Sequence, residues 1–346
     1  MSGPIETADA PLCTVCGATG EIEQQRLRDA LYGIPGIWQY RRCHGCGLLW
    51  QDPMVTEAAV GGIYTRYYTH ALAADSANSS LPRRLYAGIR EGYLAHRYGY
   101  PARSLWQRLA GRVLKVHPGR RADADFSAIY LPAAARGRVL DVGCGRGETM
   151  ATLAALGWDV RGIDPDPKAV KVARDRGLQA YCGTIWSHTL DADFDVIWMS
   201  HVVEHVHRPV EVLRRCRELL APGGTLVAVT PNSESWGYQV FRGAWRGLEP
   251  PRHLQVFSRR ALMRATHSAG FPNVEVRVTI RNARGIHSMS QAIREAERTG
   301  AQVDPPPPTL RDELWQMREW LRTFRREEDG EELVLIARTD PAHRPA

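Results

Sequence analysis

The chain has 346 residues, of which 44% are hydrophobic and 24% are charged, and its formal net charge is +7. This composition is typical of a soluble globular protein with one large domain or two. No run of about 18 apolar residues occurs, which excludes a transmembrane helix. The N-terminal residues lack a charged head followed by an apolar core, so no signal peptide is expected and the cytoplasm is the expected location.

Four of the seven cysteines form two pairs with C-x-x-C spacing, Cys13 with Cys16 and Cys43 with Cys46, and each pair is followed directly by a glycine. Two such turns can place four thiolates around one zinc ion, and the glycines permit the tight turns. Disulfides are not expected in a chain without an export signal. The spacing therefore predicts a small zinc-ribbon-like module over residues 1–52, with a structural Zn²⁺ bound by all four cysteines.

Residues 53–125 are predicted to form a helical connector or lid. Within this range, Tyr64, Tyr67 and Tyr68 have the spacing i, i+3, i+4, which places them on one face of a helix. We expect these tyrosines to line the substrate site, and simple core packing is the alternative.

Residues 81–116 contain two apolar helical faces and are predicted to form two helices that break near Pro101. The segment 81–121 contains ten Lys and Arg but one acid, Glu91, so its net charge is +9. A basic amphipathic segment can lie on an anionic membrane surface or bind a polyanion, and a solvated helical face is the alternative. A loop is predicted at 117–125, where HPGRRADAD leads into the next unit.

Between residues 126 and 340, apolar strands alternate with helical stretches, which predicts an α/β domain with a mostly parallel sheet and helices on both faces. The predicted strands are 138–144, 159–163, 180–182, 194–199, 225–230, 274–279 and 332–338. The predicted helices are 149–156, 167–176, 209–220, 258–269 and 310–326.

The first of these strands runs into a glycine-rich turn, in which Asp141, Gly143, Gly145 and Gly147 have the pattern D-x-G-x-G-x-G. Glycines let the backbone approach a ligand closely where a strand turns into a helix. The spacing differs from the G-x-G-x-x-G of dinucleotide-binding proteins. The Asp141 carboxylate would repel a pyrophosphate but attract the ammonium group of an amino-acid ligand. At the end of the next strand, Asp164 is suited to hydrogen bonds with ribose hydroxyls and to capping the following helix.

Together these motifs resemble those of class I S-adenosylmethionine-dependent methyltransferases. The resemblance covers about residues 130–340 and rests on RVLDVGCGRGE, VRGIDPDPKAV, FDVIWMSHVVEHV and LAPGGTLVAVTPN, in that order. It implies a Rossmann-like seven-stranded sheet whose last strand, EELVLIAR, is the antiparallel partner of the sixth. Residues 281–329 would then be a helical insertion before the last strand.

The same resemblance implies S-adenosylmethionine as the cofactor. The loop from Gly143 to Gly147 would surround the methionine part, Asp164 would hold the ribose, and the turn at Gly183 would face the adenine. The expected cofactor-binding residues are Asp141, Gly143, Cys144, Gly145, Gly147, Asp164, Pro165, Gly183, Thr184, Ile185, Ser200 and His201.

A narrower resemblance includes the C-x-x-C head, the tyrosine-rich connector and the segment PPRHLQVFS. This layout is similar to that of bacterial methyltransferases of glycan or secondary-metabolite pathways, and to that of nucleotide-sugar C-methyltransferases. In the C-methyltransferases a histidine before a similar segment acts as a base, which implies this role for His253. His201 and His205 are further catalytic candidates, because histidine titrates near neutral pH and both follow the fourth strand of the core.

The aromatic segment 233–251 follows the fifth strand, where a long irregular loop is often a lid or a substrate wall. Within and beside it, Trp236, Trp245 and Arg252 are expected to bind the substrate.

His201, Glu204 and His205 spell H-x-x-E-H, a zinc-peptidase pattern. A peptidase would place this pattern on a helix, whereas here it begins at the end of a buried strand, so we reject a peptidase. Ubiquinone-pathway O-methyltransferases, which this core resembles, have E-x-x-E-H there and can take a divalent cation. A catalytic metal near Glu204 and His205 therefore stays open.

The predicted function is transfer of a methyl group from S-adenosylmethionine to a hydroxyl of a small molecule, glycan or secondary metabolite. Two alternatives remain. The acceptor is a carbon atom of a nucleotide sugar, or it is ribosomal or transfer RNA, which some methyltransferases with a zinc module modify. The sequence makes no prediction of the oligomeric state.

Overall fold

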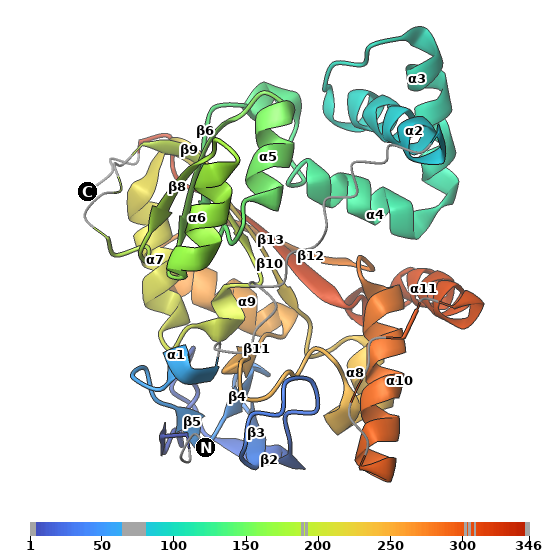
Figure 1. Cartoon of the computed structure of the whole chain (residues 1–346). Helices are drawn as coiled ribbons and strands as arrows, with labels where there is room; N and C mark the ends of the chain where they lie inside the picture. The colour runs from blue at the N-terminus through green and yellow to red at the C-terminus, as the bar shows by residue number, and fades with distance from the viewer. Residues whose placement is uncertain are drawn as a thin grey trace. The chain divides into compact units, whose positions relative to one another are not determined.

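The computed structural model describes residues 5–63, 81–187, 190, 193–300, 303, 306–307 and 309–342. The chain forms two compact units, which are described separately (Figure 1). The first unit comprises Met1–Tyr67, Met199–Glu218 and Ala228–Asp340, and the second comprises Tyr68–Trp198, Leu219–Val227 and Pro341–Ala346. Three residues expected to bind substrate lie outside the described residues, namely Tyr64, Tyr67 and Tyr68.

A seven-stranded sheet has the strand order β12-β13-β10-β9-β6-β7-β8. The last strand of the chain pairs antiparallel with the sixth strand of this sheet, from Asn273 opposite Arg338 to Thr279 opposite Glu332. This confirms the Rossmann-like α/β fold class that the sequence predicted. The strands are β6 (Arg138–Val142), β7 (Asp159–Asp164), β8 (Gln179–Cys182), β9 (Phe194–Ser200), β10 (Leu220–Pro231), β12 (Asn273–Thr279) and β13 (Glu332–Arg338).

In the second unit, β6, β7 and β8 are parallel, and α5 (Glu148–Ala155) and α6 (Pro167–Asp175) connect them. Local chemistry fixes where α6 begins. The Asp166 side chain accepts a hydrogen bond from the Lys168 N–H, and a proline occupies the first helical position. Because each helix follows the carboxyl end of its strand, the turns after β6 and β7 lie at the same edge of the sheet.

The second unit also contains α2 (Leu81–Tyr98), α3 (Leu105–Ala110), a 3-10 helix (Gly111–Val116) and α4 (Pro118–Ser127) (Figure 1). Two glycines let the backbones of these helices lie in direct contact. A Cβ atom on Gly92 would lie 1.7 Å from the carbonyl oxygen of Gln107, and one on Gly111 would lie 2.2 Å from the backbone of Gly92. The Ser104 and Gln107 side chains form a capping box at the start of α3.

The loop predicted at 117–125 is wrong, because the structure has α4 at this place. The residues are polar and begin with Pro-Gly, which obscured the helix. Pro118 is favourable at the first position of a helix, and the His117 side chain accepts a hydrogen bond from the Arg120 N–H as a cap. Ala124, on the inner face of α4, belongs to a core cluster with Tyr93 and Leu114.

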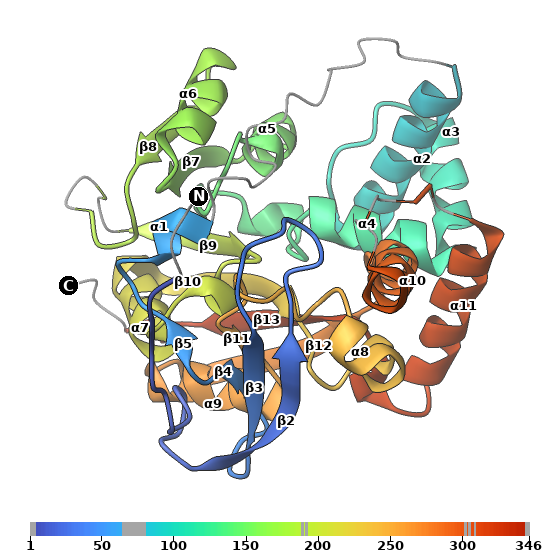
Figure 2. The ribbon, with the colours of Figure 1, turned by 60° about the horizontal axis from the view of Figure 1, so that its bottom comes forward.

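In the first unit, a four-stranded sheet has the order β11-β4-β3-β2 (Figure 2). Its N-terminal strands are β2 (Gly20–Leu27), β3 (Trp38–Cys43) and β4 (Leu49–Gln51), and β11 (Gln255–Val256) adds to their edge. A separate pair consists of β1 (Thr7–Ala8) and β5 (Met54–Val55). The strand β11 is about 200 residues further along the chain than β4, with which it pairs. The zinc-ribbon-like module therefore shares its sheet with the segment that contains His253.

The remaining helices of the first unit surround the C-terminal strands. Two of them, α10 and α11, lie between β12 and β13 in sequence, within the range expected as a helical insertion, and they pack side by side (Figure 1). The helices are α1 (Val60–Ile63), α7 (Pro209–Leu219), α8 (Trp236–Phe241), α9 (Arg259–Ser268), α10 (Ala283–Thr299) and α11 (Leu310–Thr323).

Candidate functional site

The four N-terminal cysteines come together at one end of the β2–β3 hairpin. Sγ of Cys13 lies 3.6 Å from Sγ of Cys46, and Sγ of Cys16 lies 3.3 Å from Sγ of Cys43. All four sulfur atoms lie within 4.8 Å of one another. After each pair the chain turns through a glycine with positive φ, as the C-x-x-C-G spacing predicts.

This donor set fits a zinc ion. Four thiolates at these separations suit a closed tetrahedral site, with no open position for a substrate. Burial raises the pKa of a thiol, but the Cys46 N–H and the neighbouring cysteines lower the pKa of Cys43 to about 7. One thiolate is therefore available near neutral pH to begin metal binding.

The glycine-rich turn after β6 is held by hydrogen bonds to β7. The N–H groups of Gly143 and Cys144 donate to the carbonyl of Ile163, and the Gly145 N–H donates to Oδ2 of Asp164 at 2.9 Å. Gly145 has a φ of 53°, and a Cβ atom there would meet nothing within 4 Å. The turn therefore leaves open space directly beside its backbone.

Asp141 is buried, and its Oδ2 atom has no hydrogen-bond partner in the described part of the chain. Burial, together with the negative charge of Asp164, raises the pKa of Asp141 to about 8. A buried carboxyl without a partner is costly, and a cationic ligand would remove that cost. The unpartnered Asp141 and the open space at Gly145 therefore fit the positively charged amino-acid part of S-adenosylmethionine.

Other predicted cofactor residues surround this turn in the second unit. Asp164 accepts hydrogen bonds from the N–H groups of Gly145 and Asp166, and burial raises its pKa. The Gly183 N–H donates to the carbonyl of Asp164, which ties the turn after β8 to β7. Ile185 is buried in that turn, and this chain has no acid there. The other residues of this unit that the sequence predicted to bind the cofactor are Gly147, Pro165 and Thr184.

Ser200 and His201 belong to the first unit, at the end of β9. His201 has a φ of 55°, and its imidazole joins two glutamates. Its Nδ1 atom lies 3.1 Å from Oε1 of Glu204, and its Nε2 atom lies 3.1 Å from Oε1 of Glu332.

The charges of this group follow from its burial and contacts. Burial would lower the pKa of His201, but the two carboxylates raise it to about 10. Burial would raise the pKa of Glu204, but the His201 imidazolium lowers it to about 2. Thr230 Oγ1 also donates to Glu204. His201 is therefore protonated at neutral pH, and an imidazolium cannot accept a proton from an acceptor hydroxyl.

His205 and His253 pack ring against ring, with centroids 4.8 Å apart in an edge-to-face arrangement. Nδ1 of His205 donates to the carbonyl of Arg252 at 2.9 Å, and Nδ1 of His253 donates to the carbonyl of Gly247 at 2.8 Å. These bonds make Nε2 the unprotonated nitrogen of each neutral ring. Burial lowers the pKa of His253 to about 4, so this ring is neutral at pH 7.

Access to solvent differs between the two rings. His253 is 4% exposed, whereas His205 is half-buried. Nitrogen or oxygen atoms of His205, His253 and Glu204 lie within 4.8 Å of one another, a set that could also hold a metal ion. The structure thus brings together two of the three predicted catalytic histidines, while His201 has a different partner set.

Arg252 is not placed to bind a substrate, contrary to the prediction. Its guanidinium is buried, with NH1 and NH2 donating to Asp29 at 2.9 and 3.0 Å and Nε donating to Glu249 at 2.8 Å. It also stacks on Tyr32, with Cζ 4.0 Å from the ring centroid. All three nitrogens are used inside the protein, so Arg252 joins the zinc-ribbon-like module to the segment around His253.

The aromatic segment 233–251, predicted to be a lid or a substrate wall, also differs from that prediction. Residues 236–244 of this segment form α8 and a 3-10 helix, and Trp245 is buried with its indole N–H donating to Glu331 at 2.9 Å. Trp236 stacks on Trp315 of α11 at a centroid distance of 3.7 Å. Trp245 is buried and Trp236 is half-buried against α11, because aromatic rings bury more area in such contacts than in a solvent-exposed loop.

Sequence reasoning did not include Glu332 and Thr230 in the site, although both contact the His201 group. The signal available for Glu332 was an acid at the start of an otherwise apolar strand, EELVLIAR. Glu249, which accepts from Arg252, was likewise missed, since nothing local distinguishes it from a surface acid.

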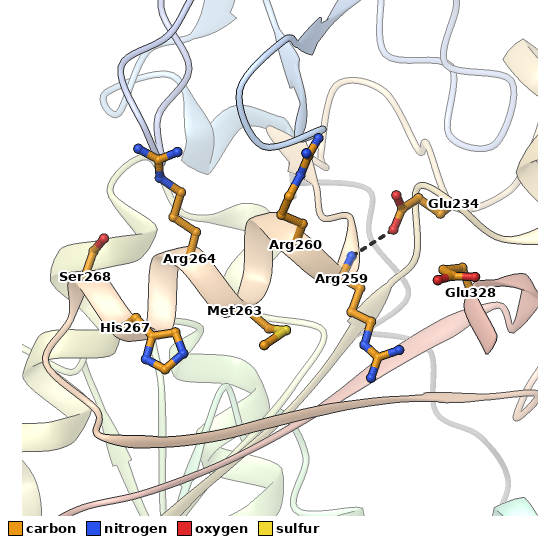
Figure 3. A pocket seen from close by; sticks show the side chains of 8 residues that line it. All are labelled: Glu234, Arg259, Arg260, Met263, Arg264, His267, Ser268 and Glu328. Carbon is orange, nitrogen blue, oxygen red and sulfur yellow. Dashed lines mark hydrogen bonds between the residues drawn. The ribbon is translucent and has the colours of Figure 1, made fainter.

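A cavity of about 610 Å³ lies along α9 (Figure 3). Its lining includes Met263 and His267, and the Arg259 N–H at its mouth donates to Glu234 (Figure 3). None of the residues predicted to bind cofactor, metal or substrate lines it. Because a methyl-transfer site must contain the cofactor turn, we do not assign this cavity to methyl transfer.

Comparison with known proteins places these features in a family. A family model described as a methyltransferase domain matches residues 95–276, which is more than half of the 346 residues. A ubiquinone biosynthesis O-methyltransferase of Cereibacter sphaeroides is 38% identical over 133 residues, covering 36% of this chain and 53% of that protein. One from Roseobacter denitrificans is 40% identical over 108 residues, covering 29% and 44%. The chain spans about half the length of these curated relatives.

Among solved structures, an S-adenosylmethionine-dependent methyltransferase from Thermotoga maritima aligns over 81% of this chain and 100% of its own, with 18% identity and a TM-score of 0.46. An S-adenosylmethionine-dependent methyltransferase from Mesorhizobium loti aligns over 63% and 97%, with 18% identity and a TM-score of 0.43.

Proposed function

The chain belongs to the methyltransferase-domain family, and from this premise we propose that it transfers a methyl group from S-adenosylmethionine to a hydroxyl of a small-molecule acceptor. The observation that supports cofactor binding best is the buried Asp141 carboxyl, whose Oδ2 atom has no hydrogen-bond partner in the described part of the chain and which lies near the end of β6, just before the glycine-rich turn. A glycan or a secondary metabolite is the acceptor class that we favour.

When bound, S-adenosylmethionine supplies an electrophilic methyl group on a sulfonium. Asp141 would bind the ammonium group of the cofactor, Asp164 would accept hydrogen bonds from its ribose hydroxyls, and Ile185 would cover its adenine with an apolar surface. Asp164 already accepts two backbone N–H bonds, which orient its carboxylate, and each oxygen keeps a lone pair for a hydroxyl.

We propose that His205 accepts the proton of the acceptor hydroxyl. Of the two rings that pack against each other, His205 is the more exposed, and its Nδ1 donates to the Arg252 carbonyl. The ionised Glu204 carboxylate lies close to it and would stabilise the imidazolium that forms. His253, buried against the His205 ring, would position it and not itself touch the acceptor.

The choice of a hydroxyl is supported by the curated relatives, whose names are ubiquinone biosynthesis O-methyltransferase. The two alternative acceptors that the sequence left open, a carbon atom and RNA, can be distinguished by their products. A carbon acceptor would give a product that resists hydrolysis conditions that cleave methyl ethers, and an RNA acceptor would give label in the nucleic-acid fraction.

For the four-cysteine cluster we propose a structural Zn²⁺. The four sulfur atoms provide a complete tetrahedral donor set, and β11 connects the same sheet to the segment around His253. The ion would therefore act on catalysis only through the position of that segment.

Two experiments test the proposal. Calorimetry with S-adenosylhomocysteine should show binding in the micromolar range, and an absence of heat at high micromolar ligand would refute the cofactor assignment. An assay with labelled methyl groups against fractions of a host extract should then place the label on a small organic molecule. Label on protein or RNA, with cofactor binding intact, would overturn the acceptor class and leave the methyltransferase assignment standing.

A further inference from the structure

The helix α11 has its polar and apolar faces reversed. Its outward face has five large apolar side chains, and their exposed fractions run from 38% to 75%. A surface helix normally directs such residues inward and its polar residues outward. These residues are Leu310, Leu314, Met317, Leu321 and Phe324.

The fully buried residues of α11 are polar and form specific hydrogen bonds. Asp312 pairs with His287 at 2.6 Å, Gln316 donates to the carbonyl of Ile280 at 3.1 Å, and Glu319 accepts from the Glu331 N–H at 3.0 Å. These contacts fix the rotation of the helix about its axis. The apolar face therefore cannot turn inward without breaking them, and its side chains remain exposed.

The spacing of the apolar residues is that of a coiled-coil seam. The steps between them are four, three, four and three residues, which is the alternation of positions d and a in a heptad repeat. Helices with this spacing pack by placing each apolar side chain between four residues of a facing helix. The seam therefore fits a second helix of the same kind.

We propose that this face binds a second copy of the chain, with the two α11 helices parallel. In a parallel pair, the g position of one helix lies beside the following e position of its partner. This places Glu313 beside Arg318 of the second copy, and Trp320 beside Arg325 of the second copy. Glu313 already pairs with Arg284 in its own chain, and a carboxylate can accept from two arginines.

The charged residues of α11 disfavour an antiparallel pair of helices and a bilayer surface. An antiparallel pair would place e beside e, and both e positions of α11 are arginines, at 311 and 318, as is the next e position in the turn after the helix, at 325. Like charges so placed are unfavourable. A bilayer surface would leave Glu313 against anionic headgroups. Of these arrangements, the parallel pair of identical helices places the acid Glu313 beside an arginine of the partner.

The size of the seam predicts a weak dimer. Five large side chains that are about half exposed would bury an area on the order of 1,000 Å² over both copies, which is near the lower limit for a specific interface. We therefore expect reversible dimers whose fraction rises with protein concentration.

Sedimentation velocity of the full chain over a wide concentration range tests the proposal. The double variant Leu314→Ser with Leu321→Ser should lower the association constant by about a hundredfold. Ile37→Ser changes an equally exposed but isolated apolar residue and should leave the association unchanged. A chain that stays monomeric at every concentration, or a dimer that survives the double variant, would overturn the proposal.

A charge exchange tests the partner and its direction. Glu313→Arg alone and Arg318→Glu alone should each weaken the dimer by about tenfold, because each places like charges together. A mixture of the two variants should restore the dimer, since charges of opposite sign then face each other across the seam. Thermal unfolding of each variant confirms that it is folded. A mixture that remains monomeric, with both variants folded, would rule out the parallel homodimer.

Discussion

Nε2 of His201 lies 3.1 Å from Oε1 of Glu332, which is 131 residues further along the chain. The same ring contacts Glu204 through Nδ1, so one imidazolium neutralises part of the charge of two buried carboxylates. Replacing His201 by Asn removes the cation that contacts both acids, so Glu204 loses this partner and Glu332 keeps only Arg281, 3.6 Å away. Removal of one partner of a buried ion pair is strongly destabilising, and with about a third of the His201 side chain exposed we expect a loss of about 2 kcal/mol in unfolding free energy.

The pH dependence of stability follows from the same pair. The folded pKa of His201 is about 10, above the ordinary value of 6.5, so its contribution is complete below pH 6.5 and is lost as the pH rises to 10. The folded pKa of Glu204 is about 2, below 4.5, so its contribution is complete above pH 4.5 and is lost as the pH falls to 2. The free energy of unfolding measured with urea should thus be greatest between pH 4.5 and 6.5. Above pH 6.5 its decrease with pH should be smaller in the His201→Asn variant, and unchanged in the control variant His267→Asn.

Asp141 should couple cofactor binding to proton release. Its pKa of about 8 in the free protein means that the carboxyl is mostly protonated at pH 7. A bound cation favours the carboxylate, so binding expels a proton, and affinity should fall by up to about tenfold per pH unit below 8. Calorimetry with S-adenosylhomocysteine in buffers of different ionisation enthalpy measures this proton.

The matched control for Asp141→Asn is Asp159→Asn, an exposed acid at the opposite end of the neighbouring strand. We expect the first variant to bind more weakly and to release no proton, and the second to behave as the unaltered protein. Equal proton release from both variants would show that Asp141 does not contact the cofactor.

Zinc should be stoichiometric with the chain and necessary for the N-terminal sheet. Cys13→Ser removes one of the four sulfur donors, so the purified variant should contain much less zinc and unfold at lower temperature. Cys182→Ser changes an exposed cysteine outside the cluster and should keep the full metal content. Elemental analysis measures both, and an unaltered chain purified without zinc would contradict the assignment.

Features that depend on short-range chemistry could be predicted from the sequence. The strand β6 contains the apolar residues Val139, Leu140 and Val142 and ends in a glycine turn, β7 ends in Asp164, and each of these signals lies within a few residues. The cysteine cluster is similar, because each C-x-x-C pair forms its own turn, and the hairpin of β2 and β3 then brings the pairs together.

Features that depend on partners far away in the sequence could not be predicted from it. Arg252 appeared available to a substrate because nothing near it in sequence indicates that Asp29, 223 residues away, takes its guanidinium. Trp236 appeared to belong to a lid because its stacking partner, Trp315, lies on α11. In both cases a polar or aromatic residue in a loop-like segment satisfies a core position, and only the tertiary contacts show it.

The catalytic proposal predicts different effects for the two facing histidines. His205→Gln should reduce kcat by about a hundredfold or more, with cofactor affinity unchanged, because it removes the base. His253→Gln should shift the pH profile of kcat and reduce it less, because this ring only positions His205. His267→Gln, on α9, is the control. Full turnover by His205→Gln would reject this residue as the base, and would return the role to His253.

The basic helical segment gives a last prediction, which concerns membrane surfaces. No helix in the described residues is long and apolar enough to cross a bilayer. An exposed apolar stripe nevertheless runs along α3 and the following 3-10 helix, and exposed basic residues flank it. Basic amphipathic helices of this kind lie in the interface of anionic bilayers. The stripe consists of Leu105, Trp106, Leu109, Val113 and Val116.

We therefore expect the chain to sediment with vesicles that contain phosphatidylglycerol and not with vesicles of phosphatidylcholine alone. Leu109→Ser with Val113→Ser should abolish this binding, since it removes the insertion of apolar side chains. Arg108→Glu with Arg112→Glu should also abolish it, and high salt should weaken it in the unaltered chain. Ile37→Ser serves as the control for exposed apolar residues. Binding to RNA that is stronger than binding to the anionic vesicles, and insensitive to the serine variant, would instead support a nucleic-acid partner for this segment.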